Sequence, residues 1–113
     1  MKSIGLAYAH DHNRITLTAT TETTLIAAVA SNRHEIQAIT IANRDNVAHT
    51  IDFRETTGGT VRQSIIIAAG DTKIFNFQSG LPAAAVNTNW TAQLRESATT
   101  AVEIATSSFR TTA

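Results

Sequence analysis

Apolar and polar residues alternate along much of this chain with a period of two. In the segment "TIDFRE", which starts at Thr50, Ile51 and Phe53 fall on one side. Asp52 and Arg54 fall on the other side. Because successive side chains of a β-strand point to opposite faces, this alternation is typical of a strand with one buried face. The pattern recurs between turn residues, and no long stretch keeps the period of a helix, so it predicts about eight or nine short strands.

Short strands at this spacing predict an all-β fold, which we interpret as an antiparallel β-sandwich of jelly-roll-like form. The chain has 113 residues, the length of one domain, so residues 1–113 are expected to form a single β-sandwich. Strand order does not follow from the pattern. The alternation assigns these residues to the core: Ile39, Ile41, Ile51, Phe53, Phe75, Leu94 and Ile104.

The turn after "TIDFRE" contains Gly58 and Gly59, which suit the positive φ angles of a tight hairpin. A two-residue loop would pair Ile51 with Ile66. A three-residue loop with a bulge would pair Ile51 with Ile65. The two registers turn opposite faces of the second strand toward the core, and the sequence leaves both open.

The second strand of this hairpin ends in three consecutive isoleucines, which cannot all face one core. The outward side chain is covered either by the protein's own connection, Gln78–Asn89, or by another protein chain. We expect a second copy of the chain, because the connection is itself apolar and uncharged and little net charge opposes self-association. The residues expected at this interface are Ile65, Ile66, Ile67 and Leu81.

Composition narrows the function further. The chain has no cysteine, which excludes disulfides, zinc–thiolate sites and thiol nucleophiles. Nine basic and nine acidic residues give a formal net charge of zero, whereas a nucleic-acid-binding protein usually has a basic excess. No window is apolar enough for a membrane span or a signal peptide. We therefore expect synthesis in a cytoplasm and no nucleic-acid or membrane partner.

Candidate chemistry is sparse. "HDH", His10 to His12, would place two imidazoles on one face of a strand, but a metal site needs a third or fourth ligand. We favour a polar turn between the first two strands. His49 lies on the apolar side of its strand, as expected for a rim or hydrogen-bonded core residue, and Trp90 leads an alternating strand and is assigned to the core. No serine elbow, carboxylate pair or phosphate loop is present, so we predict no catalytic residue, no metal and no cofactor.

Several segments together resemble one group of proteins. They are "ITIANRDNVAHTIDFRE", "IIIAAGDTKIFNF" and "SGLPAAAVNTNWTAQL", within roughly residues 34–109. Their order of strands and turns is similar to that of small β-sandwich virion structural proteins of tailed bacteriophages. These include capsid decoration or cement proteins, head-fibre proteins, and neck or tail accessory proteins. The resemblance implies a non-enzymatic oligomer, with a trimer favoured, that binds a major capsid or tail protein. It transfers no functional residue.

The function expected from this resemblance is that of a capsid decoration protein, located in the virion after synthesis in the host cytoplasm. Such a protein stabilises the head by bridging capsomers, because contacts present only in the assembled shell shift the equilibrium toward it. The alternative is a carbohydrate-binding or adhesion β-sandwich, which an exposed Trp90 beside a groove would favour. An enzyme ranks third, since it would need His10, His12 and another polar ligand to converge in a pocket.

Overall fold

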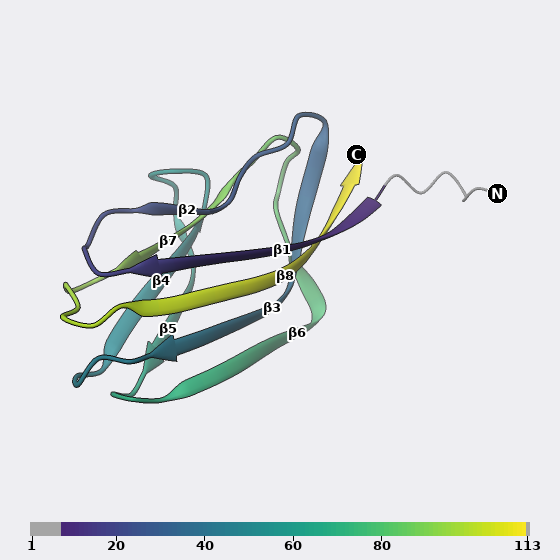
Figure 1. Ribbon diagram of the computed structural model, residues 1–113. Helices are drawn as coiled ribbons and strands as arrows, with labels where there is room; N and C mark the ends of the chain where they lie inside the picture. Colours follow the sequence, from purple (N-terminus) through teal and green to yellow (C-terminus); the bar gives the residue numbers. More distant parts are fainter. Residues whose placement is uncertain (1–7, 113) are drawn as a thin grey trace.

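A computed structural model describes residues 8–112, and all regular structure in this range is β (Figure 1). The eight strands are β1 Tyr8–Leu17, β2 Thr23–Ile26, β3 Asn32–Asn43, β4 His49–Glu55, β5 Val61–Ile67, β6 Thr72–Pro82, β7 Trp90–Leu94 and β8 Val102–Thr112. They form two four-stranded antiparallel sheets that pack face to face. This arrangement confirms the predicted antiparallel β-sandwich.

The strand order defines a jelly roll. One sheet has the order β1-β8-β3-β6 and the other the order β2-β7-β4-β5. Only the β4–β5 connection joins neighbouring strands of one sheet, because every other connection crosses between the sheets (Figure 1). The chain therefore resembles one long hairpin, closed at the β4–β5 turn and wrapped into two layers, which is the jelly-roll arrangement.

The β4–β5 hairpin adopts the second of the two predicted registers. Ile51 pairs with Ile65, and an irregularity follows between Phe53 and Arg54. The connection spans residues 56–60, where Thr56 and Gly58 both have a φ of 74°. This register turns Ile65 toward the core together with Ile51.

The core lies between the two sheets, and six of the seven predicted core residues are fully buried in it. Phe75 is the exception: it is only partly buried, because β6 is the edge strand of its sheet. Trp90 is completely buried, which confirms its assignment to the core. The buried apolar residues are Leu17, Leu25, Ile26, Ile36, Ile39, Ile41, Ile51, Phe53, Ile65, Ile67, Ala83, Trp90, Ala92, Leu94, Val102 and Ile104.

The inner face of β1 and β8 changes character along its length. Val102 and Ile104 are buried and apolar, whereas Thr106 and Ser108 further along β8 are buried and polar. Asn13 of β1 pairs with Thr106 in the ladder. Side-chain oxygens of these three residues are buried without a hydrogen-bond partner in the described range. The sandwich is thus apolar at one end of this sheet and polar at the other.

Candidate functional site

The predicted interface isoleucines divide between core and surface. Ile65 and Ile67 are buried in the sandwich, so their assignment to an interface was wrong. The period of two that buries them turns Ile66 outward, where 68% of the residue is exposed. Leu81 is partly buried and packs against the core. Of the predicted interface residues, only Ile66 lies fully on the surface.

A second exposed isoleucine was missed by the sequence interpretation. Ile74 of β6 is 64% exposed. The signal was present in "TKIFNF", since the period of two that turns Phe75 and Phe77 inward turns Ile74 outward. β6 pairs regularly with β3 over residues 72–76, so Ile74 lies at the centre of a regular edge.

The two isoleucines lie on edge strands that follow one another in sequence. β5 is the edge of one sheet, β6 is the edge of the other, and a short turn joins them (Figure 1). Each edge strand leaves a row of backbone N–H and C=O groups without a neighbouring strand. We call β5 and β6 together the isoleucine side of the sandwich.

The opposite edges carry features that discourage pairing with another strand. β2 has only four residues and an irregular register. β1 carries the polar sequence "HDHNR" from His10 to Arg14. Short, irregular or charged edges are the devices that proteins use against unwanted strand addition. The isoleucine side has some of them as well, since Lys73 and Pro82 lie on β6 and the pairing of β6 with β3 is irregular between Ile36 and Ala38. Its Arg62 is already engaged inside the molecule, by Glu55 and by the ring of Trp90 at 5.3 Å.

The "HDH" segment lies within β1, so the predicted polar turn was wrong. His10 and His12 share the outer face of the strand, with ring centroids 4.9 Å apart. His10 stacks on Phe109 at 4.5 Å, and its Nε2 lies 3.0 Å from the Ser107 hydroxyl. Within residues 8–112 no group of three or more histidine, aspartate or glutamate side chains is placed to hold a metal ion.

An ionic network covers the outer face of the β2-β7-β4-β5 sheet. Asp52 of β4 accepts hydrogen bonds from Arg95 Nε at 3.0 Å and Arg95 Nη2 at 2.9 Å. It also accepts one from the Ser64 hydroxyl of β5 at 2.6 Å. The Arg95 guanidinium, followed by the Ser64 hydrogen bond, holds the pKa of Asp52 below its usual value despite burial. Arg95 is therefore largely occupied by one carboxylate.

His49 is a hydrogen-bonded core residue, as the sequence predicted. Its Nε2 lies 2.7 Å from Asp45 Oδ2, and both residues are buried. Asp45 also accepts the backbone N–H groups of Thr99 at 3.2 Å and Thr100 at 3.3 Å. The hydrogen bond from His49, together with the backbone donors, holds the pKa of Asp45 below its usual value. The pair thus ties the β3–β4 connection to the β7–β8 connection.

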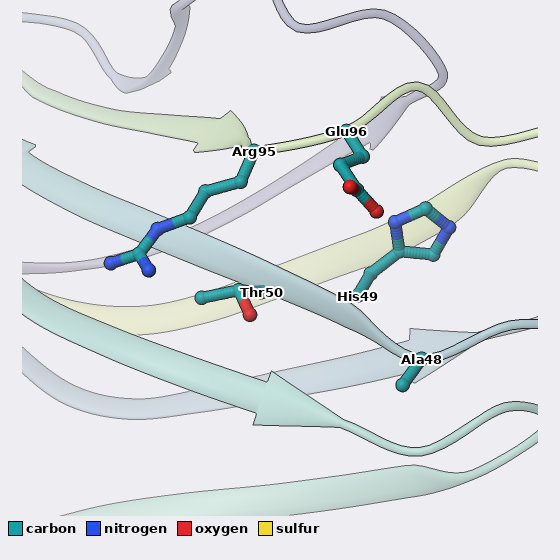
Figure 2. A pocket seen from close by; sticks show the side chains of 5 residues that line it. All are labelled: Ala48, His49, Thr50, Arg95 and Glu96. Carbon is teal, nitrogen blue, oxygen red and sulfur yellow. The ribbon is translucent and has the colours of Figure 1, made fainter.

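A cavity of about 340 Å³ opens beside this pair. It is lined by Ala48, His49, Thr50, Arg95 and Glu96 (Figure 2). The Glu96 carboxylate points toward the imidazole, whereas the Arg95 guanidinium extends away from it (Figure 2). His49 Nδ1 is buried and has no hydrogen-bond partner among the described residues. The sequence did not reveal this cavity, because its residues come from two segments far apart in the chain.

No family model matches the sequence, and no curated protein is significantly similar to it. Solved structures with the same fold exist. A protein of the Bacillus endospore appendages, described as "a novel family of disulfide-linked pili", is 18% identical with a TM-score of 0.56, covering 95% of this chain and 89% of the other. PirA is 12% identical with a TM-score of 0.53, covering 85% and 92%.

A third similar structure is the virus-like particle of the Macrobrachium rosenbergii extra small virus. Its chain is 11% identical with a TM-score of 0.50, covering 97% of this chain and 82% of the other. At such identities these likenesses establish the jelly-roll fold alone. No helix in residues 8–112 is long and apolar enough to cross a membrane.

Proposed function

We propose that this chain is a non-enzymatic structural subunit that self-associates through its isoleucine side. The observation that carries the proposal is the exposure of two large apolar side chains on edge strands: β5 and β6 present Ile66 and Ile74 to solvent, whereas β1 is polar and β2 is short. Exposed apolar groups on an open sheet edge favour the addition of another strand.

A second copy is the occupant that these features fit. A strand placed beside β5 or β6 would bond the free backbone groups of the edge and lay a side chain against the isoleucine. Covering each isoleucine contributes roughly 1–2 kcal/mol from removal of apolar surface from water. The formal net charge of zero adds little long-range repulsion between copies.

The finer proposal concerns the setting. We place the subunit in a phage virion, as a decoration protein that forms a homo-oligomer, a trimer by resemblance, on a major capsid or tail protein. The segments within residues 34–109 that resemble phage structural proteins support it, and the jelly roll is compatible with it. Its work would be mechanical, since contacts made only with the assembled shell stabilise that shell.

The structure lacks the feature that would favour the carbohydrate-binding alternative. It depended on an exposed Trp90 that could stack on a sugar ring, and Trp90 is completely buried beneath Arg62. A buried indole offers no stacking surface to a ligand.

Self-association is tested by sedimentation of four purified chains: wild type, Ile66→Glu, Ile74→Glu and Val47→Glu. Val47 is the matched control, because it is half-exposed but lies in the β3–β4 loop and not on an edge strand. We expect a wild-type oligomer that the isoleucine variants dissociate and the Val47 variant preserves, with an unchanged β-sheet circular dichroism spectrum throughout. A wild-type monomer at low micromolar concentration would contradict the proposal.

The virion setting is tested separately, with an antibody against the chain. The measurement asks whether the chain co-sediments with filled particles released by the bacterium that carries its gene. Recovery in the particle fraction supports a virion role. Recovery only in the particle-free fraction rules it out while leaving the self-association result intact.

A further inference from the structure

The inner face of β1 changes from polar to apolar along the strand. Asp11 and Asn13 face inward in its first half, and Ile15 and Leu17 face inward in its second half. Leu17 is buried in the core, and Ile15 packs against it. β1 is also an edge strand, so β8 is its only neighbour in the sheet (Figure 1). The hydrophobic effect thus anchors the second half of β1, whereas Asp11 and Asn13 gain nothing from it.

Buried polar atoms without a partner gather behind this first half. Six side-chain atoms in residues 8–112 are buried without a hydrogen bond, and four of them lie here: Asn13 Oδ1, His34 Nδ1, Thr106 Oγ1 and Ser108 Oγ. The ladder places Asn13 directly opposite Thr106. Ser108 lies opposite Asp11, whose Oδ2 is 4.0 Å from His34 Nδ1. A buried polar atom without a partner costs free energy, which is recovered when water reaches the atom.

The side-chain contacts that hold the first half of β1 are partly open to water. Asp11 Oδ2 accepts a hydrogen bond from Arg110 Nε at 2.9 Å, but more than a quarter of each side chain is exposed. On the outer face, His10 is exposed even though it stacks on Phe109. Ion pairs that face water contribute little to stability. The backbone hydrogen bonds to β8 therefore carry most of the attachment of this segment.

We propose that residues 8–13, which we call the β1 strap, are a releasable segment of the sandwich. The β1 strap separates from β8 as a unit, while Ile15, Leu17 and the two sheets stay in place. Release lets water reach the four unpaired atoms, and this offsets part of the cost of breaking the ladder. Release also opens the edge of β8, so the closed β1 strap shields an edge to which another strand can add.

Native-state hydrogen exchange of the dilute wild-type chain, followed by NMR at increasing urea concentration, tests the release. The ladder amides between the β1 strap and β8 should exchange at least about tenfold faster than those between β3 and β8, at rates nearly independent of urea. The ladder amides of residues 14–17 should behave like those between β3 and β8. Equal rates and equal urea dependence for all three groups would overturn the proposal, because the β1 strap would then open only on global unfolding.

A reversible crosslink tests whether exchange requires separation from β8. The chain has no cysteine, and His12 and Ser107 lie directly opposite each other in the ladder. Opposite positions of an antiparallel pair have a Cα spacing that a disulfide can bridge. In the chain with His12→Cys and Ser107→Cys, we expect the oxidised form to exchange the amides of the β1 strap at least about tenfold more slowly than the reduced form. Identical rates in the two forms would overturn the proposal.

A double substitution tests the cause of the release. Asn13→Val with Thr106→Val replaces two side chains that carry unpaired buried atoms by an apolar cross-strand pair. We expect it to slow exchange in the β1 strap roughly three- to tenfold. Thr16→Val is the control, since Thr16 is exposed on the same strand, and it should leave these rates unchanged. A double variant that exchanges as fast as wild type would overturn the proposal, because the unpaired atoms would then not favour release.

Discussion

Two buried threonines differ in whether the side-chain hydroxyl has a hydrogen-bond partner. Thr91 and Thr106 are both buried, one in each sheet. The Thr91 hydroxyl donates a hydrogen bond to Glu22, whereas the Thr106 hydroxyl has no partner among the described residues. The same side chain is thus satisfied at one position and desolvated without compensation at the other.

Replacement of each threonine by valine should therefore have opposite effects. Thr106→Val removes an unpaired buried hydroxyl, so we expect the free energy of unfolding to stay unchanged or rise by up to about 1 kcal/mol. Thr91→Val removes a hydrogen bond to a carboxylate and should lower it by about 1–2 kcal/mol. Urea unfolding of the two variants measures both. Equal losses would mean that an ordered water binds the Thr106 hydroxyl.

At the scale of elements, the faces of strands were predictable and their neighbours were not. The period of two identified both sides of β4, but it left open which isoleucines of β5 face outward, and Ile74 was missed. The register of β4 with β5 stayed open because glycines at 58 and 59 fit more than one loop. "HDH" was misplaced because polar residues suit both a turn and the outer face of an edge strand. Pairing such as that of β1 with β8 depends on contacts that no local pattern contains.

The backbone conformation of the β4–β5 connection predicts the effect of two substitutions on stability. Thr56 is β-branched yet has a φ of 74°, a region where non-glycine residues are strained. We expect Thr56→Gly to raise the free energy of unfolding by about 0.5–1 kcal/mol. Gly59→Ala should lower it by about 1–3 kcal/mol, because its Cβ would lie 2.5 Å from the Glu55 carbonyl oxygen. Denaturant unfolding tests the pair, and a stability loss in Thr56→Gly would refute the strain argument.

For the whole molecule, carboxylates join segments that lie far apart in the chain. Glu22 accepts from Thr91 and the Gly58 backbone, and Glu103 pairs with Arg44 and Arg14. These contacts hold the pKa of each carboxylate below its usual value. No sequence pattern predicted these carboxylate contacts, because the two partners of each contact lie on different elements. The cavity at His49 escaped prediction for the same reason.

These contacts predict loss of stability in acid. Glu22, Asp45, Asp52 and Glu103 all have a folded pKa below the usual values of 3.8 for aspartate and 4.5 for glutamate. Their contribution is complete above those values and is lost as pH falls through the lower folded pKa values. The melting temperature should therefore drop progressively below about pH 4.5. Glu103→Gln should flatten part of this slope, and a melting temperature constant down to pH 3 would contradict the assignment.

The wrapped-hairpin topology also has a consequence for the order in which the strands pair during folding. Only β4 and β5 are close in sequence; β3 with β6, β2 with β7 and β1 with β8 join progressively more distant segments, until Tyr8 meets Thr111. Each step encloses a longer loop, and the entropy lost in closing it precedes the contacts that compensate for it. We therefore expect folding to be slow, to start at the β4–β5 turn and to end with the pairing of the two ends of the described chain. Because Ile66 and Ile74 lie on the strands that pair early, the proposed self-association would compete in time with completion of the fold.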